Sequence, residues 1–250
     1  MPRGIERTPA RAHIPYMIRF LPILLILAGA ILYARLLAAR TARELDSNSV
    51  ELVDPELRPV LQRLAQALDL PRIKVHLYEV PMINGLASHD GRIFLTRGFY
   101  DRFRAGHVTA EEMASVIAHE LGHVALGHSR RRMIDFTGQN AVKMGLALVL
   151  GRLLGGLGVW VAQGLMSLLM ARLSRRDEYE ADAYASALLL KAGIGTEPQK
   201  SLFRKLGAMA GQGAAAAPAW LLTHPRTEER IAAIEANEAR WLSPPPDAPA

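Results

Sequence analysis

The sequence predicts an α+β fold that is predominantly α-helical, with one small antiparallel β-sheet and an N-terminal membrane helix. Three observations lead to this prediction. Several segments repeat apolar residues at intervals of three and four, which is the period of a helix packed on one face. Two short segments alternate apolar and polar residues and are rich in β-branched and aromatic residues, as strands are. Near the amino terminus, the run "FLPILLILAGAILYA" carries no charge over residues 20–34.

Residues 1–43 form a separate N-terminal region, in which a transmembrane or signal-anchor helix is predicted over about residues 16–39. The apolar run reaches the roughly 20 residues that a spanning helix needs if Arg19 and Arg35 extend toward the lipid headgroups. Arginines before the run slightly outnumber those after it, which favours export of the following domain. A cleaved signal peptide is the alternative, because small residues follow in "LLAARTA".

Residues 44–240 are predicted to form one folded domain, and the tail over 241–250, which ends in "SPPPDAPA", is predicted to be disordered. The domain begins with an amphipathic helix over 55–69, followed by strands within "RIKVHLYEV" and "GRIFLTRG". The segment "PMINGLASHDG" between these strands is rich in turn residues and is interpreted as a connection. Further amphipathic helices are predicted over 175–192 and roughly 226–240.

An apolar insert over about residues 137–173 interrupts the domain. Residues 153–170 form 18 consecutive positions without a charge, so length alone permits a membrane span. The glycines of this stretch allow close helix packing in either setting, and Lys143 and Arg152 make a first crossing unfavourable. We therefore favour a helical hairpin over 141–173 that is buried or lies against membrane lipid, with a membrane span as the alternative.

Composition excludes several classes of function. The net charge is +6, but the basic residues are scattered and do not alternate with aromatic residues, so no nucleic-acid-binding surface is indicated. The same positive charge suits contact with anionic lipid. The chain contains no cysteine, which excludes a disulfide framework, a thiolate metal site and a cysteine nucleophile. Any bound metal must therefore be held by His, Asp or Glu.

The segment "HELGH" over residues 119–123 has the spacing of a catalytic zinc site. Four residues make just over one helical turn, so His119 and His123 project from the same face and can bind one metal ion. Glu120 stands next to the first histidine, where it can hold a water molecule and take its proton. Zinc lowers the pKa of a coordinated water to about 7, which makes hydroxide available at neutral pH.

The sequence also defines the helix that carries this motif. Thr109 and Glu112 have the spacing of a capping box, and up to about Gly127 only Gly122 interrupts the helical pattern. Two histidines and a glutamate are costly to bury in an apolar helix without partners, which favours a metal site over a chance occurrence of the motif. A glycine in a helix interior costs about 1 kcal/mol relative to alanine, so Gly122 indicates that another element needs the space beside the metal.

A catalytic zinc site usually has three protein ligands and an open position for water. The common extension of the motif places a third histidine six residues after the second, but that position is a serine here. His128 would lie about 140° around the helix from His123, so we interpret it as a surface or packing residue, and His107 as a surface residue. Glu178 and Asp182 are better candidates. Their spacing suits a metal ligand and a hydrogen-bond partner of a ligand histidine, but suits a solvated acidic helix face equally well.

The chain resembles the HtpX-like family of zinc metallopeptidases, which includes the CAAX prenyl endopeptidases. The motifs of that family occur here in the same order over about residues 55–235. They are Asn84-Gly85-Leu86-Ala87, the strand in "GRIFLTRG", the motif at 119–123, Ser174-Arg175 with Glu178 and Ala181-Asp182, His224-Pro225, and Arg230-Ile231. The resemblance implies a zincin fold of the gluzincin type. The sequence departs from the family at Gly85 and Leu86, where the family usually has Ala and Phe.

The resemblance assigns roles around the metal. It implies that His119, His123 and Glu178 bind one zinc ion per chain. It implies Glu120 as the general base that activates water and then as the general acid toward the leaving amine. Asp182 is implied as the residue that accepts a hydrogen bond from a ligand histidine and fixes its tautomer.

The resemblance also assigns residues around the substrate. It implies that the strand over 93–96, with Ile93 and Leu95, is the edge strand along which a peptide lies. Asn84 is implied as a contact to the substrate backbone, although the Asn-Gly pair is equally a hairpin-turn pattern. His224 is implied to face the active site and to stabilise the oxyanion, and a histidine in a turn is the alternative.

We therefore predict a membrane-anchored, zinc-dependent endopeptidase of a bacterial inner membrane, with its catalytic domain in the periplasm. The resemblance alone implies misfolded or damaged membrane and envelope proteins as substrates. Contacts with lipid are expected through the N-terminal helix and through 141–171. The alternative is a catalytically silent membrane scaffold or chaperone-like adaptor on the same fold, which the intact Glu120 disfavours. A prenyl-protein-processing enzyme would need more spanning segments than the chain contains.

Overall fold

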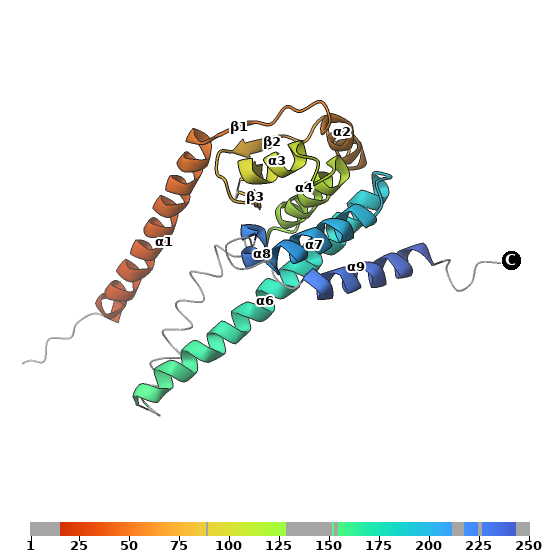
Figure 1. Cartoon of the computed structure of the whole chain (residues 1–250). Coiled ribbons are helices and arrows are strands. Elements are labelled where there is room, and N and C mark those ends of the chain that lie inside the picture. Colours follow the sequence, from red (N-terminus) through yellow and green to blue (C-terminus); the bar gives the residue numbers. More distant parts are fainter. Residues whose placement is uncertain are drawn as a thin grey trace, which may run out of the picture. The chain divides into compact units, whose positions relative to one another are not determined.

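The computed structural model describes residues 16–88, 90–128, 152, 155–211, 218–224 and 227–243. The chain divides into two compact units, Met1–Thr41 and Ala42–Ala250. Most of helix α1 (Tyr16–Ser47) belongs to the first unit, and every other element belongs to the second (Figure 1). The predicted disordered tail beyond 243 and the first part of the apolar insert, 137–151, lie outside the described residues.

Helix α1 contains the helix predicted over 16–39 and continues to Ser47. Leu25, Leu32 and Tyr33 each expose more than half of their surface, at 63%, 60% and 67%. Among the described parts of the chain, no helix combines the length and the apolar character needed to cross a membrane. The predicted N-terminal membrane helix is therefore not confirmed.

Helix α6 (Gly156–Lys191) runs for 36 residues. It joins the second half of the apolar insert to the acidic segment that was predicted as a separate helix over 175–192. Leu157 and Trp160, near its start, are 73% and 76% exposed. These two side chains are not buried, and the first half of the predicted hairpin lies outside the described residues, so the hairpin stays a prediction.

One four-stranded sheet lies in the second unit, with the spatial order β1-β2-β4-β3. Its strands are β1 (Ser49–Glu51), β2 (Val75–Tyr78), β3 (Gly85–Ala87) and β4 (Ile93–Thr96). The outer pairs, β1 with β2 and β3 with β4, are antiparallel, whereas β2 and β4 are parallel. The prediction of an antiparallel sheet is wrong for the central pair. The reason is a crossover, because the chain passes from β2 to the outer edge as β3 and returns between them as β4.

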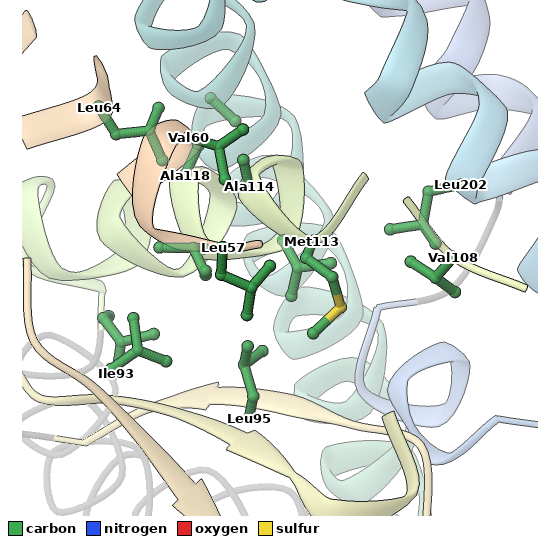
Figure 2. Packing of buried hydrophobic residues seen from close by; sticks show 14 of the residues in the cluster. Leu57, Val60, Leu64, Ile93, Leu95, Val108, Met113, Ala114, Ala118 and Leu202 are labelled. Atoms are coloured by element: carbon green, nitrogen blue, oxygen red, sulfur yellow. The ribbon is translucent and has the colours of Figure 1, made fainter. Parts of the chain in front are cut away.

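Strand β4 is an inner strand, and the prediction that it forms the edge of the sheet is wrong. Its backbone is paired with β2 on one side and with β3 on the other, so it has no free hydrogen-bonding side for a peptide. Ile93 and Leu95, predicted to bind substrate, are 1% and 0% exposed. Figure 2 shows both side chains standing on the sheet among the buried apolar residues, near Leu57. They are core residues, and the edge beside them belongs to β3.

Strand β3 lies in the segment predicted to be a connection. The turn between β3 and β4 runs from Ser88 to Arg92, with the backbone N–H of Ser88 donating to the carbonyl of Arg92 at 2.9 Å. Gly91 in this turn has φ of 87°, which glycine adopts without the usual steric cost. Asn84 instead leads into β3, since its carbonyl accepts a hydrogen bond from the N–H of Thr96 at 3.1 Å. The hairpin-turn alternative for the Asn-Gly pair is therefore wrong.

Among the described residues, the second unit contains six further helices. They are α2 (Arg58–Ala67), α3 (Arg97–Arg104), α4 (Ala110–Ala125), α7 (Glu197–Ala210), α8 (Ala219–Thr223) and α9 (Thr227–Leu242). The helices predicted over 55–69, around the metal motif and over 226–240 are confirmed as α2, α4 and α9, with somewhat different ends. Helices α3, α7 and α8 were not predicted. The fold is mostly helical with a small mixed sheet, in partial agreement with the predicted class.

Helix α4 lies in the apolar core, where it packs against α2, α6, α7 and the sheet. Figure 2 shows Leu57, Val60 and Leu64 at the α2 side of the core close to Ala114 and Ala118 of α4. These side chains are all buried. The alanines keep α4 close to α2, and the dense packing leaves the motif helix little freedom to move.

The start of α4 is fixed as the sequence predicts. The backbone N–H of Glu112 donates to Thr109 Oγ1 at 3.2 Å, and the backbone N–H of Thr109 donates to Glu112 Oε2 at 2.8 Å. This reciprocal pair is a capping box. Ser201 and Lys205 of α7 also donate to the Glu112 carboxylate, at 2.7 and 2.8 Å. The Glu112 side chain therefore links α4 to α7. The capping box also provides hydrogen-bond partners for backbone N–H groups that the start of a helix leaves unpaired.

Asp54 fixes the entry to α2. Its Oδ1 accepts hydrogen bonds from the backbone N–H groups of Glu56 at 2.7 Å and Leu57 at 3.3 Å, and its Oδ2 accepts one from the Tyr100 hydroxyl at 2.7 Å. Burial alone would raise the pKa of Asp54, but these hydrogen bonds and the nearby Arg104 hold that pKa below its ordinary value. The ionised form of Asp54 therefore stabilises the folded state.

Replacing Asp54 by asparagine should lower the free energy of unfolding by about 1–2 kcal/mol at pH 7, because charge-assisted hydrogen bonds are lost. An aspartate with a depressed folded pKa contributes stability above its unfolded pKa of about 3.9, and that contribution disappears as the pH falls through the folded pKa. The difference between parent and variant should therefore shrink below about pH 4. Urea unfolding from pH 7 to pH 3 measures it. A difference independent of pH, or one equal to that of exposed Asp101→Asn, would contradict this role.

Candidate metal centre

Three donor groups meet between α4 and α6. His119 and His123 project from one face of α4, as predicted, and their Nε2 atoms lie 3.1 Å apart. Glu178 of α6 lies opposite, with Oε2 at 3.4 Å from His119 Nε2 and Oε1 at 3.5 Å from His123 Nε2. Ligands at 2.0–2.1 Å from a tetrahedral zinc ion are separated by about 3.3–3.4 Å. The three side chains therefore fit a single tetrahedral ion.

The close approach of α6 depends on Gly122. A Cβ atom at this position would lie 3.0 Å from the carbonyl oxygen of Ala181 and 3.1 Å from its Cα. The backbone of α6 thus occupies the space that a side chain at this position of α4 would fill. The prediction that Gly122 makes room for another element beside the metal motif is confirmed.

Asp182 lies behind His119, one helical turn after Glu178. Its Oδ1 is 2.9 Å from His119 Nδ1, and both side chains are almost completely buried. A metal ion on Nε2 leaves the proton on Nδ1, which then donates to this carboxylate. The structure therefore places Asp182 where its predicted role requires.

Arg230 of α9 holds Asp182 in place. Its Nε donates to Oδ2 at 2.6 Å and its Nη2 donates to Oδ1 at 2.7 Å, while the arginine is only 1% exposed. Burial alone would raise the pKa of Asp182, but the guanidinium of Arg230 lowers it. In the sequence, Arg230 is recognisable only as part of the Arg230-Ile231 motif, which predicts no role for it. A buried arginine cannot be recognised from local sequence, because its partner lies 48 residues away.

The electrostatics of the centre favour a cation. Burial alone would lower the pKa of His119, but the hydrogen bonds to Asp182 and Glu178 raise it to about 9. Burial alone would raise the pKa of Glu178, but its contacts with His119 and His224 hold it far below its ordinary value. The carboxylates therefore stabilise positive charge between them, which a divalent metal ion supplies directly.

Glu120 lies beside these donors with part of its hydrogen-bonding capacity unused. It is 2% exposed, and its Oε1 has no hydrogen-bond partner among the residues that the structure describes. This oxygen is 3.7 Å from His224 Nε2 and would be 3.7 Å from a Cβ atom placed on Gly85. A buried carboxylate oxygen between metal donors and a strand suits a water molecule or a substrate group as its partner.

His224 enters the same cluster from the end of α8. The side chain is buried. Its Nδ1 contacts Glu178 Oε2 and lies 3.4 Å from His119 Nε2. Arg230 Nη1 donates to the His224 carbonyl at 3.1 Å. His224 therefore faces the centre as the resemblance implies, although it also ends a helix, and Pro225 lies outside the described residues. Its role toward an oxyanion stays a prediction.

His128 lies against the metal motif, although ideal helical geometry predicts that it points away from His123. It is fully buried, and its Nδ1 lies 2.9 Å from Nδ1 of His123. The helical extrapolation fails because α4 ends at Ala125 and Gly127 adopts φ of 68°, which redirects the chain. Of the two predicted readings of His128, the surface residue is wrong and the packing residue agrees with its burial, whereas His107 is exposed as predicted.

Asn84 stands at the start of β3, on the outer edge of the sheet. Its backbone N–H donates to Thr96 Oγ1 at 2.9 Å, which fixes the chain at this point. Its side-chain Oδ1 is buried and has no partner within the described part of the chain. Strand β3 also packs on α4, so Asn84 immediately precedes the strand that passes next to Glu120.

The site is the arrangement expected of a metallopeptidase. It combines two histidines on one face of a helix, an opposing glutamate from a second helix, and an adjacent glutamate whose Oε1 has no hydrogen-bond partner among the described residues. Comparison with known proteins agrees with this class. The model of the peptidase family M48 matches residues 51–238. The chain belongs to this family, and the metallopeptidase resemblance found in the sequence is confirmed.

Individual relatives agree with this placement. The metalloprotease LoiP of Escherichia coli strain K12 is 31% identical over 176 residues, which cover 68% of this chain and 68% of LoiP. The metalloprotease YcaL of the same organism is 30% identical over 189 residues, covering 71% of this chain and 70% of YcaL. The human mitochondrial metalloendopeptidase OMA1 is 26% identical over 164 residues, covering 63% of this chain and 30% of OMA1.

Proposed function

We propose that this protein is a zinc-dependent endopeptidase in which His119, His123 and Glu178 bind one zinc ion per chain. The observation that carries the proposal is the spacing of these three donor groups, which matches the edges of a zinc tetrahedron, next to Glu120. Two imidazoles and one carboxylate favour zinc over calcium or magnesium, which prefer oxygen ligands. When bound, zinc acidifies water and polarises the scissile carbonyl.

Glu120 is proposed as the general base and then the general acid. Its buried Oε1, without a partner among the described residues, can accept the proton of the attacking water. The same carboxyl group can then return the proton to the leaving amine. Its position next to the donors and next to β3 supports both steps, because water and peptide must meet there.

The substrate is proposed to bind along β3 and not along β4. Among the described residues, no strand pairs with the outer side of β3, so its backbone groups can add an extended peptide. Main-chain pairing accepts many sequences, as expected for a peptidase of broad specificity. The buried Oδ1 of Asn84, at the start of β3, supports Asn84 as a further contact to the substrate backbone.

His224 is proposed to donate a hydrogen bond to the oxyanion that develops on the substrate. Its ring contacts Glu178 and its Nε2 is 3.7 Å from Glu120 Oε1, so it borders the space where the carbonyl would react. A second role is also consistent with the geometry. The donor atoms of His119, His123, Glu178 and His224 all lie within 4.8 Å of one another, which would suit His224 as a fourth ligand.

A role in quality control of membrane or envelope proteins is proposed, with attachment to the membrane through the N-terminal helix. Its support is the uncharged run over 20–34 and the name of one relative. This relative is the beta-barrel assembly-enhancing protease of Yersinia pestis, 27% identical over 225 residues that cover 82% of this chain and 44% of the relative. Fractionation of cells producing the full chain tests the attachment, and recovery of the protein in the soluble fraction would argue against it.

Removal of the metal provides the direct test of the proposed activity. The full-length protein should cleave casein, lose this activity in a strong chelator, and regain it with one equivalent of zinc. Cleavage is followed on gels, and bound zinc is measured by mass spectrometry. Cleavage that persists after all metal is removed would refute the metal mechanism. Tight binding of one zinc without cleavage of any unfolded protein would favour the scaffold alternative.

The same assay separates the two roles of His224. With zinc saturating, His224→Ala should cleave about 100-fold more slowly if the imidazole stabilises the oxyanion. Its zinc affinity should then stay close to that of the parent. Faster cleavage with weaker zinc binding would instead identify His224 as a fourth ligand that occupies the position needed for water.

A further inference from the structure

A second chain of hydrogen bonds lies behind the metal centre. His128 is fully buried, with its Nδ1 at 2.9 Å from Nδ1 of His123 and its Nε2 at 3.2 Å from Oε2 of Glu180. Glu180 is anchored in turn by Arg176, whose Nε donates to Oε1 at 2.7 Å. The contacts thus run from a metal-binding imidazole through a second imidazole to a carboxylate at the surface.

The direction of these hydrogen bonds follows from the metal. His123 faces Glu178 and His119 with Nε2, so a metal ion held there leaves the proton on Nδ1. That N–H can only donate, so Nδ1 of His128 must accept. A neutral His128 then carries its own proton on Nε2 and donates it to Glu180. Each ring nitrogen of His123 and His128 therefore has one consistent role as a donor, an acceptor or a metal ligand.

This assignment argues against a second metal ion. His128, Asp177 and Glu180 are chemically able to bind a metal and lie near one another. However, Nε2 of His128 must carry a proton while Nδ1 accepts from His123, so it has no lone pair to offer. Asp177 Oδ1 is 3.8 Å from this nitrogen, beyond hydrogen-bonding distance. The cluster is therefore better suited to orient His123 than to hold a metal.

The fold explains why His123 needs an intermediary. Glu178 and Asp182 share one face of α6, so Asp182 reaches His119 directly. Glu180 lies two residues from each of them and therefore points to another side of α6. The left-handed turn at Gly127 carries His128 into the space between His123 and Glu180. One ligand histidine is held by α6 directly, and the other through the residue that follows the motif helix.

We propose that His128 is a positioning residue that fixes the tautomer and the orientation of His123, and that Glu180 anchors His128. The proposal rests on the proposed role of His123 as a metal ligand. Partners of this kind typically change metal affinity by about 10- to 100-fold when they are removed. His128 thereby serves His123 as Asp182 serves His119.

Two substitutions at His128 separate positioning from packing. His128→Phe fills the buried space but accepts no hydrogen bond, and should weaken zinc binding about 10- to 100-fold. His128→Asn is smaller, but its side-chain oxygen can still accept from Nδ1 of His123, and should recover most of the zinc affinity. Glu180→Gln retains an acceptor for Nε2 and should weaken binding only a fewfold. Competition with a chromophoric chelator measures zinc affinity for the full-length proteins.

Further readouts separate this inference from the proposed function. Cobalt substituted for zinc should give an altered visible spectrum in His128→Phe and a parent-like one in His128→Asn. Circular dichroism establishes that each variant is folded. Unchanged zinc affinity in a folded His128→Phe, or equal losses in Phe and Asn, would overturn the positioning role while a zinc-bound, active parent upholds the proposed function. A second zinc in the parent that disappears in His128→Phe would overturn it in favour of a second metal site.

Discussion

Replacing Glu120 by glutamine should reduce peptide-bond cleavage by about a thousandfold or more while one zinc ion stays bound. General acid–base groups contribute about 10²- to 10⁴-fold to rates, and this carboxylate is proposed to act in both directions of proton transfer. Glutamine keeps the size of the side chain and an oxygen, but it cannot accept the proton. Since Glu120 is not among the three proposed ligands, zinc content should be unchanged.

Casein cleavage and zinc content of the Glu120→Gln protein measure this effect. Glu111→Gln, the same chemical change in the first turn of α4, provides a matched control and should stay active. Loss of zinc together with activity in Glu120→Gln would show that the residue supports the metal and not the proton transfer. Full activity in the variant would assign the base to another group, and retained biological function without cleavage would favour the scaffold alternative.

Replacing Arg230 by methionine should lower the free energy of unfolding by about 3–5 kcal/mol, because the change removes the guanidinium that pairs with the buried charge of Asp182 and leaves the weaker contact with His119. Arg230 donates two hydrogen bonds to this carboxylate and is 1% exposed. Its guanidinium carbon also lies 4.4 Å from the ring centre of Phe203 and 4.8 Å from that of Trp220. Urea unfolding in the presence of a chelator measures the effect without the contribution of bound zinc.

A double variant identifies the source of this loss. Arg230→Met combined with Asp182→Asn also removes the buried charge that has lost its guanidinium, and should recover more than half of the lost stability. It should not recover zinc affinity, because the asparagine is a weaker acceptor for the His119 N–H. If the double variant is as unstable as Arg230→Met alone, the stacking on Phe203 and Trp220 is the main contribution and the charge argument fails.

The edge of the sheet is formed by β3, although the sequence predicts that β4 forms it. The alternation in "GRIFLTRG" correctly indicates a strand, and β4 is that strand. Spatial order in a sheet depends on which distant segments pair, and nothing within Ile93–Thr96 specifies that both of its sides are occupied. The short β3, in a segment rich in turn residues, takes the edge instead. The strand proposed to bind the peptide is therefore β3 and not β4.

His128 and Arg230 illustrate the same limit for side chains. The direction of His128 follows from an ideal helix only as far as the helix continues, and the left-handed conformation of Gly127 ends that continuation. Gly127 itself was the available indication, because a glycine after the last helical turn commonly adopts this conformation. Arg230 gave no such indication, since its role depends on a carboxylate on another helix.

By itself, the sequence determined the features whose interactions span one or two helical turns. These are the motif helix, its capping box, the shared face of His119 and His123, the helical spacing of Glu178 and Asp182, and the glycine that admits α6. Such features depend on backbone geometry and near neighbours, which local pattern encodes. Only the tertiary structure decided the strand order, the anchoring of Asp182 by Arg230, and the contact of His128 with His123. These features depend on contacts between segments that are far apart in the chain. The free energy of such contacts is distributed over many residues, so no single local motif predicts them.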